Sequence, residues 1–201
     1  VDVAAFRRCG RLPSTPEGYV LRVPAGDRAD SQTFFAGENG FERMQRVDID
    51  DVESRSMGES DVDRRGLSDP LGTTDFAINY YSLDPGEAFA GGLHTHLDQE
   101  EVFYVVEGTA TFETKDEATA ETETVEVGPD EAVRFARGEF QQGRNETDER
   151  VVALALGAPD ESTDVRVPEA CRECDSDVLS VVVTDEGMLL KCPDCGATVG
   201  M

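Results

Sequence analysis

The sequence predicts an all-β protein, in which an antiparallel β-barrel or sandwich is followed by a small domain around four cysteines. Short segments of alternating apolar and polar residues, separated by turn signals, run from residue 75 to about residue 157. This region shows no helical periodicity. Beyond residue 168, two pairs of cysteines stand at a spacing that is typical of structural metal sites.

The strands are predicted from segments rich in β-branched and aromatic residues. Turn signals such as Asp84-Pro85-Gly86 and Gly128-Pro129-Asp130 separate them. The expected strands are residues 75–83, 101–108, 109–114, 122–127, 131–136 and 151–156. We therefore expect a barrel over residues 75–160, a linker over 161–167 and the four-cysteine domain over 168–201.

The composition is strongly acidic. The chain has 201 residues and a net charge of −25, from 43 acidic and 18 basic residues. Lysine occurs only at Lys115 and Lys191, and such a composition is typical of halophilic proteins, whose self-repulsion is screened by salt. The alternative is a partly disordered acidic protein, which the regular alternation in residues 75–160 argues against.

The first 43 residues differ from the rest. They carry six basic and six acidic residues, so the whole net charge falls on residues 44–201, and they also contain the odd cysteine, Cys9. We expect the functional protein to begin near Met44, with residues 1–43 a mispredicted start or a disordered extension. The alternative is an N-terminal arm with a role of its own. Residues 44–74 are expected to form a polar lead-in segment with a loop or a short turn of helix.

The sequence lacks the signals of a membrane or exported protein. No stretch is long and apolar enough to span a membrane, and the N-terminal residues lack the apolar core of a secretory signal. We therefore expect a cytoplasmic protein. In a reducing compartment cysteines are more often metal ligands than disulfides.

The only two histidines, His94 and His96, form a His-x-His pattern. Residues two apart in an extended segment point to the same face, so both imidazoles can reach one ion. Glu101 can bring a carboxylate to the same point, and Glu100 is its rival, although strand parity places the two on opposite faces. Two imidazoles and a carboxylate suit a divalent first-row metal. The alternative is a pair of exposed loop histidines beside an acidic surface.

The surrounding residues resemble the two motifs of the cupin superfamily. His94-Thr95-His96 is followed after four residues by Glu101, and after six more by Gly108, as in the first motif. The glycine that opens this motif is displaced, because Ala88 holds its usual place. The second motif is similar to residues 136–145, in which Gly138 and Asn145 match and Ala136 replaces a proline. The resemblance covers about residues 75–157, and the chain resembles small, single-barrel, Cupin_2-like proteins of halophilic archaea.

This resemblance implies a jelly-roll-like antiparallel barrel with a divalent metal, for which Fe, Mn, Ni and Zn are the candidates. Gln141 stands where the family has its last metal-binding histidine. As a ligand, its amide would complete a site of two histidines, Glu101 and Gln141. Without it, the site has two histidines and one carboxylate with open positions, as in non-haem iron oxygenases. In the third alternative the site only binds a ligand.

The four C-terminal cysteines form two Cys-x2-Cys pairs, Cys171 with Cys174 and Cys192 with Cys195, separated by 17 residues. This spacing is typical of a zinc ribbon with four thiolate ligands. The residues between the pairs predict a β-hairpin that turns at Asp185-Glu186-Gly187. A rubredoxin-like iron site and two disulfides are the alternatives. The ribbon has seven acidic and two basic residues, which argues against nucleic acid as its partner.

Two functions are consistent with these observations. The first is a metal-dependent oxygenase, isomerase or lyase that acts on a small polar metabolite. The second is a non-catalytic module that senses a small molecule or metal and contacts a protein partner through its ribbon; a second copy of the chain is another candidate partner. Whether the protein is an enzyme stays open, and no catalytic residue can be named, since the sequence offers no further histidine as an acid or base. The cupin fold itself selects no reaction.

Overall fold

The computed structural model describes residues 44–55, 62–184 and 187–200, all of them within one compact unit of residues 36–201. The predictions for residues 1–43, including Cys9, lie outside the described residues. In the described part, no helix is long and apolar enough to cross a membrane.

Most of the described elements are β-strands. The elements in chain order are η1 (Ile49–Asp51), β1 (Asp63–Gly66), α1 (Ser68–Leu71), β2 (Ala77–Leu83), β3 (Thr95–His96), β4 (Glu100–Glu107), β5 (Ala110–Lys115), β6 (Glu123–Val127), β7 (Ala132–Phe135), β8 (Phe140–Arg144), β9 (Val151–Ala158), β10 (Val165–Val167), β11 (Leu179–Thr184), β12 (Gly187–Lys191) and β13 (Thr198–Gly200). This composition confirms the predicted all-β class, and β2, β4, β5, β6, β7 and β9 match the strands expected from the sequence.

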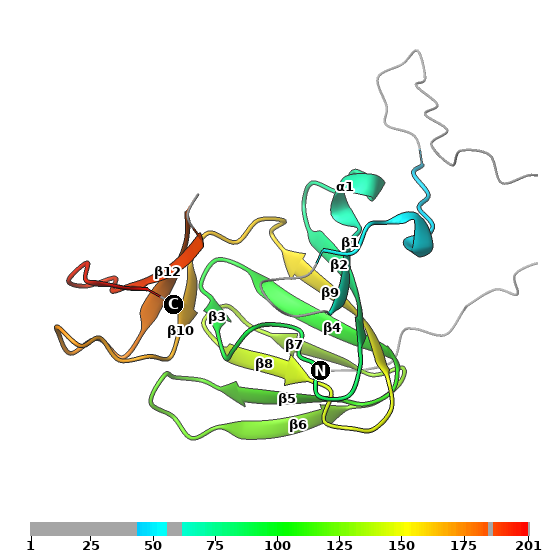
Figure 1. Ribbon diagram of the computed structural model, residues 1–201. Coiled ribbons are helices and arrows are strands. Elements are labelled where there is room, and N and C mark those ends of the chain that lie inside the picture. The colour runs from blue at the N-terminus through cyan, green and yellow to red at the C-terminus, as the bar shows by residue number, and fades with distance from the viewer. Residues whose placement is uncertain (1–43, 56–61, 185–186, 201) are drawn as a thin grey trace, which may run out of the picture. The chain divides into compact units, whose positions relative to one another are not determined.

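Two antiparallel sheets form the barrel (Figure 1). One has the strand order β1-β2-β9-β4-β7 and the other the order β6-β5-β8. The buried core joins them, because it combines side chains from β2, β4, β7 and β9 with side chains from β5 and β6. In β9, Val151, Ala153 and Ala155 alternate with less buried residues, which is the pattern of a strand with one face on a core.

Phenylalanines fill the centre of this core. Phe103 of β4 and Phe112 of β5 lie with ring centroids 5.0 Å apart, and Phe135 of β7 lies 5.4 Å from Phe112. Phe89, from the loop after β2, stacks on Phe112 at 5.6 Å. Each buried ring of this size contributes roughly 2 kcal/mol through the area that it removes from water. The barrel therefore has a core that does not depend on a metal.

Gly108 and Asn145 shape the barrel rather than the site. Gly108 has a φ of 75°, and a Cβ atom there would lie 2.3 Å from the carbonyl oxygen of Arg150, so only glycine fits. Asn145 is fully buried and donates through Nδ2 to the carbonyl oxygens of Leu83 and Glu149 at 3.1 and 2.7 Å. It thereby ties the end of β2 to the loop before β9.

The C-terminal strands form a third antiparallel sheet together with β3, in the order β13-β12-β11-β10-β3. Its β11–β12 pair confirms the predicted hairpin, whose turn residues Asp185 and Glu186 lie outside the described residues. Leu179, Leu190 and Cys192 are the buried residues of its small core. The sheet does not end within the ribbon, because β10 also pairs with β3 of the barrel, with Val165 opposite His96.

Five short strands were not expected: β1, β3, β8, β10 and β13. β1 lies within the polar lead-in segment, for which the sequence suggested only a loop or a helical turn, and α1 follows it directly. Its sequence, Asp-Arg-Arg-Gly, has no strand pattern, and it is extended because all four residues pair with β2. Tertiary pairing outweighs local propensity in such strands.

Candidate metal centres

The structure brings together His94, His96 and Glu101. His96 lies in β3, His94 directly before this strand, and Glu101 near the start of β4. One ligand atom from each of the three side chains lies within 4.8 Å of the others. Thus three residues from two neighbouring segments of the barrel converge on a space of the size that one metal ion requires.

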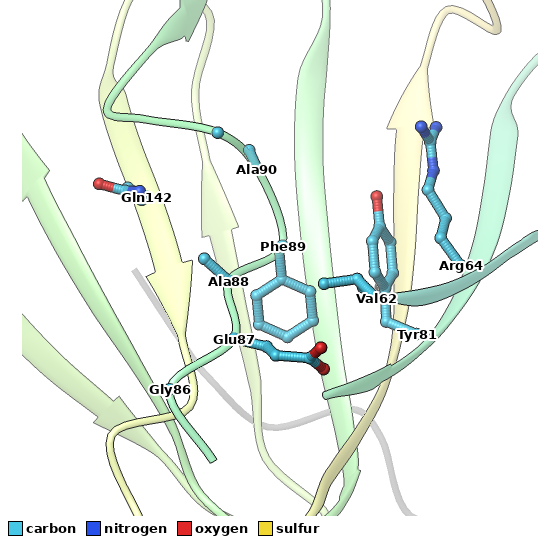
Figure 2. A pocket seen from close by; sticks show the side chains of 10 residues that line it. Val62, Arg64, Tyr81, Gly86, Glu87, Ala88, Phe89, Ala90 and Gln142 are labelled. Atoms are coloured by element: carbon cyan, nitrogen blue, oxygen red, sulfur yellow. The ribbon is translucent and has the colours of Figure 1, made fainter. Parts of the chain in front are cut away.

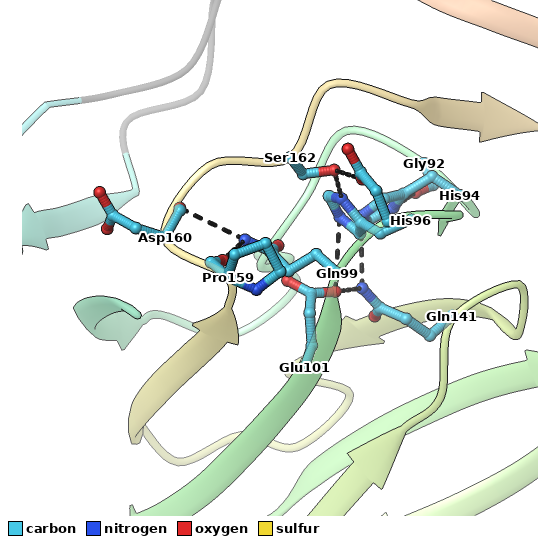
Figure 3. A network of polar contacts seen from close by, with 10 residues as sticks. Gly92, His94, His96, Gln99, Glu101, Gln141, Pro159, Asp160 and Ser162 are labelled. Atoms are coloured by element: carbon cyan, nitrogen blue, oxygen red, sulfur yellow. Dashed lines mark hydrogen bonds and ion pairs between the residues drawn. The ribbon is translucent and has the colours of Figure 1, made fainter. Parts of the chain in front are cut away.

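Both imidazoles direct their Nε2 atoms into this cluster. His94 Nδ1 lies 2.8 Å from the carbonyl oxygen of Gly92, to which it must donate a proton. His96 Nδ1 lies 2.7 Å from Ser162 Oγ (Figure 3). On the inner side, His96 Nε2 lies 3.5 Å from Glu101 Oε2. The outer nitrogens are thus engaged, which leaves the inner nitrogens as the atoms that could hold a metal.

Gln141 completes the cluster from β8. Its main chain pairs with His94, with N–H···O distances of 3.1 and 2.8 Å. Its Nε2 atom lies 2.8 Å from Glu101 Oε2 and 3.3 Å from His94 Nε2. The Oε1 atom is buried and has no hydrogen-bond partner among the described residues. A rotation of the terminal amide would turn this unpaired oxygen toward the same point as the three other ligand atoms.

Burial disfavours charge on all three side chains of the cluster in the absence of a cation. Desolvation raises the pKa of Glu101 to about 7, against the hydrogen bond from Gln141 and the charge of Arg64, which lower it. Burial, followed by the neighbouring His94, lowers the pKa of His96 to about 4, and burial also lowers the pKa of His94. The contact between His96 and Glu101 is therefore not an ion pair at neutral pH.

These features fit a divalent metal ion. Two neutral imidazoles offer bare nitrogens, the carboxyl group gains its charge when a cation offsets the cost of burial, and an amide oxygen lacks a partner. Glu100, the rival ligand, faces away and forms an exposed ion pair with Arg134 at 2.8 Å. The structure thus places Glu101 in the cluster and Glu100 outside it.

A pocket of about 250 Å³ opens beside the cluster. His94, His96, Glu101 and Gln141 contribute to its wall together with other barrel residues. Arg64 of β1 and Tyr81 of β2 also line it, and the guanidinium carbon of Arg64 lies 5.8 Å from the centre of the Tyr81 ring. Arg64 is a candidate ligand-binding residue that the sequence does not reveal, because its place depends on the unexpected strand β1.

A second pocket of about 430 Å³ adjoins the first, since Arg64, Tyr81 and Phe89 line both. In Figure 2, Arg64 and Tyr81 lie on one side of it, beside Val62. Arg64 also donates to Asn79 Oδ1 at 3.2 Å. The guanidinium group therefore lies where the two pockets adjoin.

The ribbon cysteines form a second, separate cluster. Cys171 Sγ lies 3.6 Å from Cys195 Sγ, and Cys174 Sγ lies 3.5 Å from Cys192 Sγ. All four sulfurs lie within 4.8 Å of one another, and none forms a disulfide. Tetrahedral zinc with Zn–S bonds of about 2.3 Å requires sulfurs about 3.8 Å apart. The cluster therefore fits a small zinc ribbon.

The local backbone favours the thiolate form of at least one of these cysteines. Backbone N–H groups of Cys195 and Asp194 lower the pKa of Cys192 to about 6. Gly196, with a φ of 77°, lets the chain turn back, so that the Cys192 amide donates to the carbonyl oxygen of Ala197 at 2.8 Å. A thiolate is the form that binds metal, so this turn favours binding at neutral pH.

Residues 79–157 match the Cupin_2 family, described as a cupin domain, and the chain therefore contains a cupin domain. The comparison with curated proteins found no significant match. Among solved structures, a sugar phosphate isomerase of the cupin superfamily from Silicibacter pomeroyi is similar, with a TM-score of 0.54 and 21% identity over 75% of this chain and 94% of that chain. A putative sugar phosphate isomerase from Acidithiobacillus ferrooxidans has a TM-score of 0.48 and 19% identity over 70% and 76%. At 21% identity, the likeness to the Silicibacter pomeroyi structure shows the fold alone.

Proposed function

We propose that this cupin-domain protein is a metal-dependent enzyme, an oxygenase, isomerase or lyase, that acts on a small polar metabolite. The observation that carries the proposal is the convergence of His94, His96 and Glu101, within 4.8 Å, on the wall of a pocket of about 250 Å³. A site of two imidazoles and one carboxylate leaves coordination positions open for a substrate. When bound, the metal would act as a Lewis acid on a substrate oxygen or as a site for dioxygen.

Arg64 narrows the substrate class to small anions. Its guanidinium group lies on the wall of the same pocket and is close enough to Glu101 to lower the pKa of that carboxyl group. A planar guanidinium group recognises carboxylates and phosphates through paired hydrogen bonds. A metabolite that carries a carboxylate or phosphate could place this group on Arg64 and a neighbouring oxygen at the metal.

The remaining groups of the pocket limit the available chemistry. Tyr81 and Asp160 are the other titratable residues on its wall besides Arg64 and the cluster itself. Burial raises the pKa of the Tyr81 hydroxyl, so at neutral pH it is a proton donor rather than a base. Proton transfer would therefore use Tyr81 or Asp160, because Glu101 would hold the metal, and the cation would bear the developing charge.

Metal analysis and anion binding together test the proposal. Purified wild-type protein should contain a divalent metal in addition to the ribbon metal, and His94→Ala should lose only the former. Malonate and inorganic phosphate should raise the melting temperature of the metal-loaded protein, and Arg64→Ala should remove this effect. Arg65→Ala is the matched control, because Arg65 is the next residue of β1 and pairs with Asp63 at 2.9 Å instead of lining the pocket. A barrel without metal would contradict the proposal, and unchanged anion binding in Arg64→Ala would contradict the substrate class.

The alternative function is a sensor whose ribbon contacts a protein partner. Two observations favour it: Gln141 takes the place of a histidine ligand, and the ribbon hairpin exposes an apolar pair. Val183 and Met188, which lie opposite each other in β11 and β12, are 77% and 46% exposed. A metal-loaded protein that is inert in assays of oxygen uptake and of isomerase and lyase turnover, but loses a binding partner in Val183→Asp, would favour the sensor over the enzyme.

A further inference from the structure

His94 and His96 are held by different kinds of partner. The outer nitrogen of His94 donates to the backbone of its own loop, at Gly92, 2.8 Å away. The outer nitrogen of His96 lies 2.7 Å from the hydroxyl oxygen of Ser162, which is 66 residues away in the sequence. Ser162 follows the matched cupin domain and precedes β10. One ligand of the barrel thus depends on a side chain from the segment that leads into the ribbon.

The direction of each hydrogen bond follows from Asp98. The Ser162 hydroxyl lies 2.7 Å from Asp98 Oδ1, and the other carboxylate oxygen accepts from the backbone N–H and the hydroxyl of Thr163 at 2.7 and 2.8 Å. An ionised carboxylate only accepts, so Ser162 must use its one proton for Asp98. The Ser162 oxygen must then accept from His96 Nδ1. This assigns the proton of the neutral His96 ring to Nδ1 and leaves Nε2 bare.

The main chain on either side of these hydrogen bonds is also paired. The amide of Leu97 donates to the carbonyl oxygen of Asp164 at 2.9 Å, and His96 lies opposite Val165 in the β3–β10 pair. The segment that begins at Ser162 therefore contacts His96 twice. The Ser162 hydroxyl contacts the His96 ring, and β10, which follows, pairs with the His96 main chain.

We propose that Ser162 and Asp98 are positioning residues for His96, which hold its ring with the proton on Nδ1 and Nε2 directed at the metal position. This inference rests on the proposed metal function of the barrel. A hydrogen bond to the outer nitrogen fixes the orientation and tautomer of a ligating imidazole, and its loss typically lowers metal affinity 10- to 100-fold.

The first test needs no metal. Because the chain has two histidines, a long-range ¹H–¹⁵N NMR spectrum of the metal-free protein shows two imidazoles, and His96→Asn assigns them. At pH 7.5 we expect the wild-type His96 ring to carry its proton on Nδ1, Ser162→Ala to show a mixture of tautomers, and Ser162→Thr, which keeps the hydroxyl, to restore the wild-type spectrum. Identical spectra for the wild type and Ser162→Ala would overturn the proposal whether or not the barrel binds metal.

The second test measures affinity by titration of Ni²⁺ against a competing chelator. We expect about a tenfold or greater loss of barrel affinity in Ser162→Ala and near wild-type affinity in Ser162→Thr. Ser180→Ala is the matched control, since Ser180 lies in the same sheet, opposite Arg166, and does not line the pocket beside the cluster. Unchanged affinity in Ser162→Ala would refute the positioning role. Absence of barrel binding in the wild type would instead refute the proposed function, and the tautomer measurement would still decide the role of Ser162.

Discussion

The two candidate metal centres differ in how their ligands are brought together. The ribbon cysteines come in two local pairs on tight turns, and the hairpin of β11 and β12 joins the pairs. The barrel ligands come from β3, β4 and the segment before β3, and their outer contacts reach as far as Ser162. A centre of the first kind can be recognised from spacing alone, whereas a centre of the second kind requires the whole fold.

The two regions also differ in what holds them together. The barrel buries a large apolar cluster with four phenylalanine rings, among them Phe103 and Phe112. The buried core of the ribbon is Leu179, Leu190 and the ligand Cys192. A core this small does not stabilise a domain of this length without metal or disulfides. We infer that the metal stabilises the fold of the ribbon, whereas the fold of the barrel prepares a site for its metal.

The largest expected effect follows from removal of a ribbon ligand. Structural zinc contributes roughly 10–16 kcal/mol to small domains of this kind. Cys192→Ser should therefore lose the ribbon metal, and the amides of β11 and β12 should lose their protection from hydrogen exchange, whereas those of β4 and β9 keep theirs. Metal analysis and hydrogen-exchange mass spectrometry measure both effects. Cys9→Ser is the control for loss of a thiol, and a protected hairpin in Cys192→Ser would contradict the comparison.

In the barrel, by contrast, the loss of a metal ligand should leave the fold intact. His96→Ala removes a ligand but leaves the phenylalanine core intact, so we expect barrel affinity for Ni²⁺ to fall at least about 100-fold, roughly 3 kcal/mol, without unfolding. The ribbon metal should remain. Titration and thermal unfolding of the same samples test this, and a barrel that unfolds when the ligand is lost would show that its metal, too, is structural.

Gly143 tests the barrel core without touching a ligand. A Cβ atom at Gly143 of β8 would lie 2.3 Å from Phe112 Cε1 and 2.7 Å from Phe89 Cδ2. Since both rings lie in a packed core, Gly143→Ala should destabilise the barrel by about 1–3 kcal/mol. Denaturant unfolding measures this loss, and the ribbon amides should keep their protection. Gly91→Ala is the control, because a Cβ atom there would meet nothing within 4 Å.

The sequence predicts all four ligands of the ribbon centre but only some of the residues around the barrel centre. His94, His96 and Glu101 follow from short-range spacing in extended segments, as do the four cysteines. Arg64 and Ser162 could not be found in this way, because they reach the site through β1 and β10, two short strands whose pairing depends on the rest of the fold. The resemblance to the second cupin motif places Gln141 among the candidate ligands, but only the structure shows that its amide oxygen is buried without a partner among the described residues.

The smallest expected effect concerns Gln141. Its main chain is paired with His94, so a side chain at this position is already directed at Glu101 and His94. Gln141→His would place an imidazole, a stronger ligand for late first-row metals than an amide, at the same point. We expect affinity of the barrel for Ni²⁺ to rise about tenfold, roughly 1.4 kcal/mol, with the ribbon metal unchanged.

The matched control for this variant is Gln142→His. Gln142 is the next residue of β8, lines the adjoining pocket instead of the cluster, and accepts from Arg144 at 2.9 Å. The histidine that it introduces therefore lies outside the ligand set. If both variants raise the affinity for Ni²⁺ above that of the wild type by the same factor, measured by the same chelator competition, then a histidine anywhere on β8 raises binding. A rise confined to Gln141→His would show that the barrel holds a place for a fourth ligand, which Gln141 fills only weakly, and that its metal site, unlike that of the ribbon, is open to adjustment by one residue.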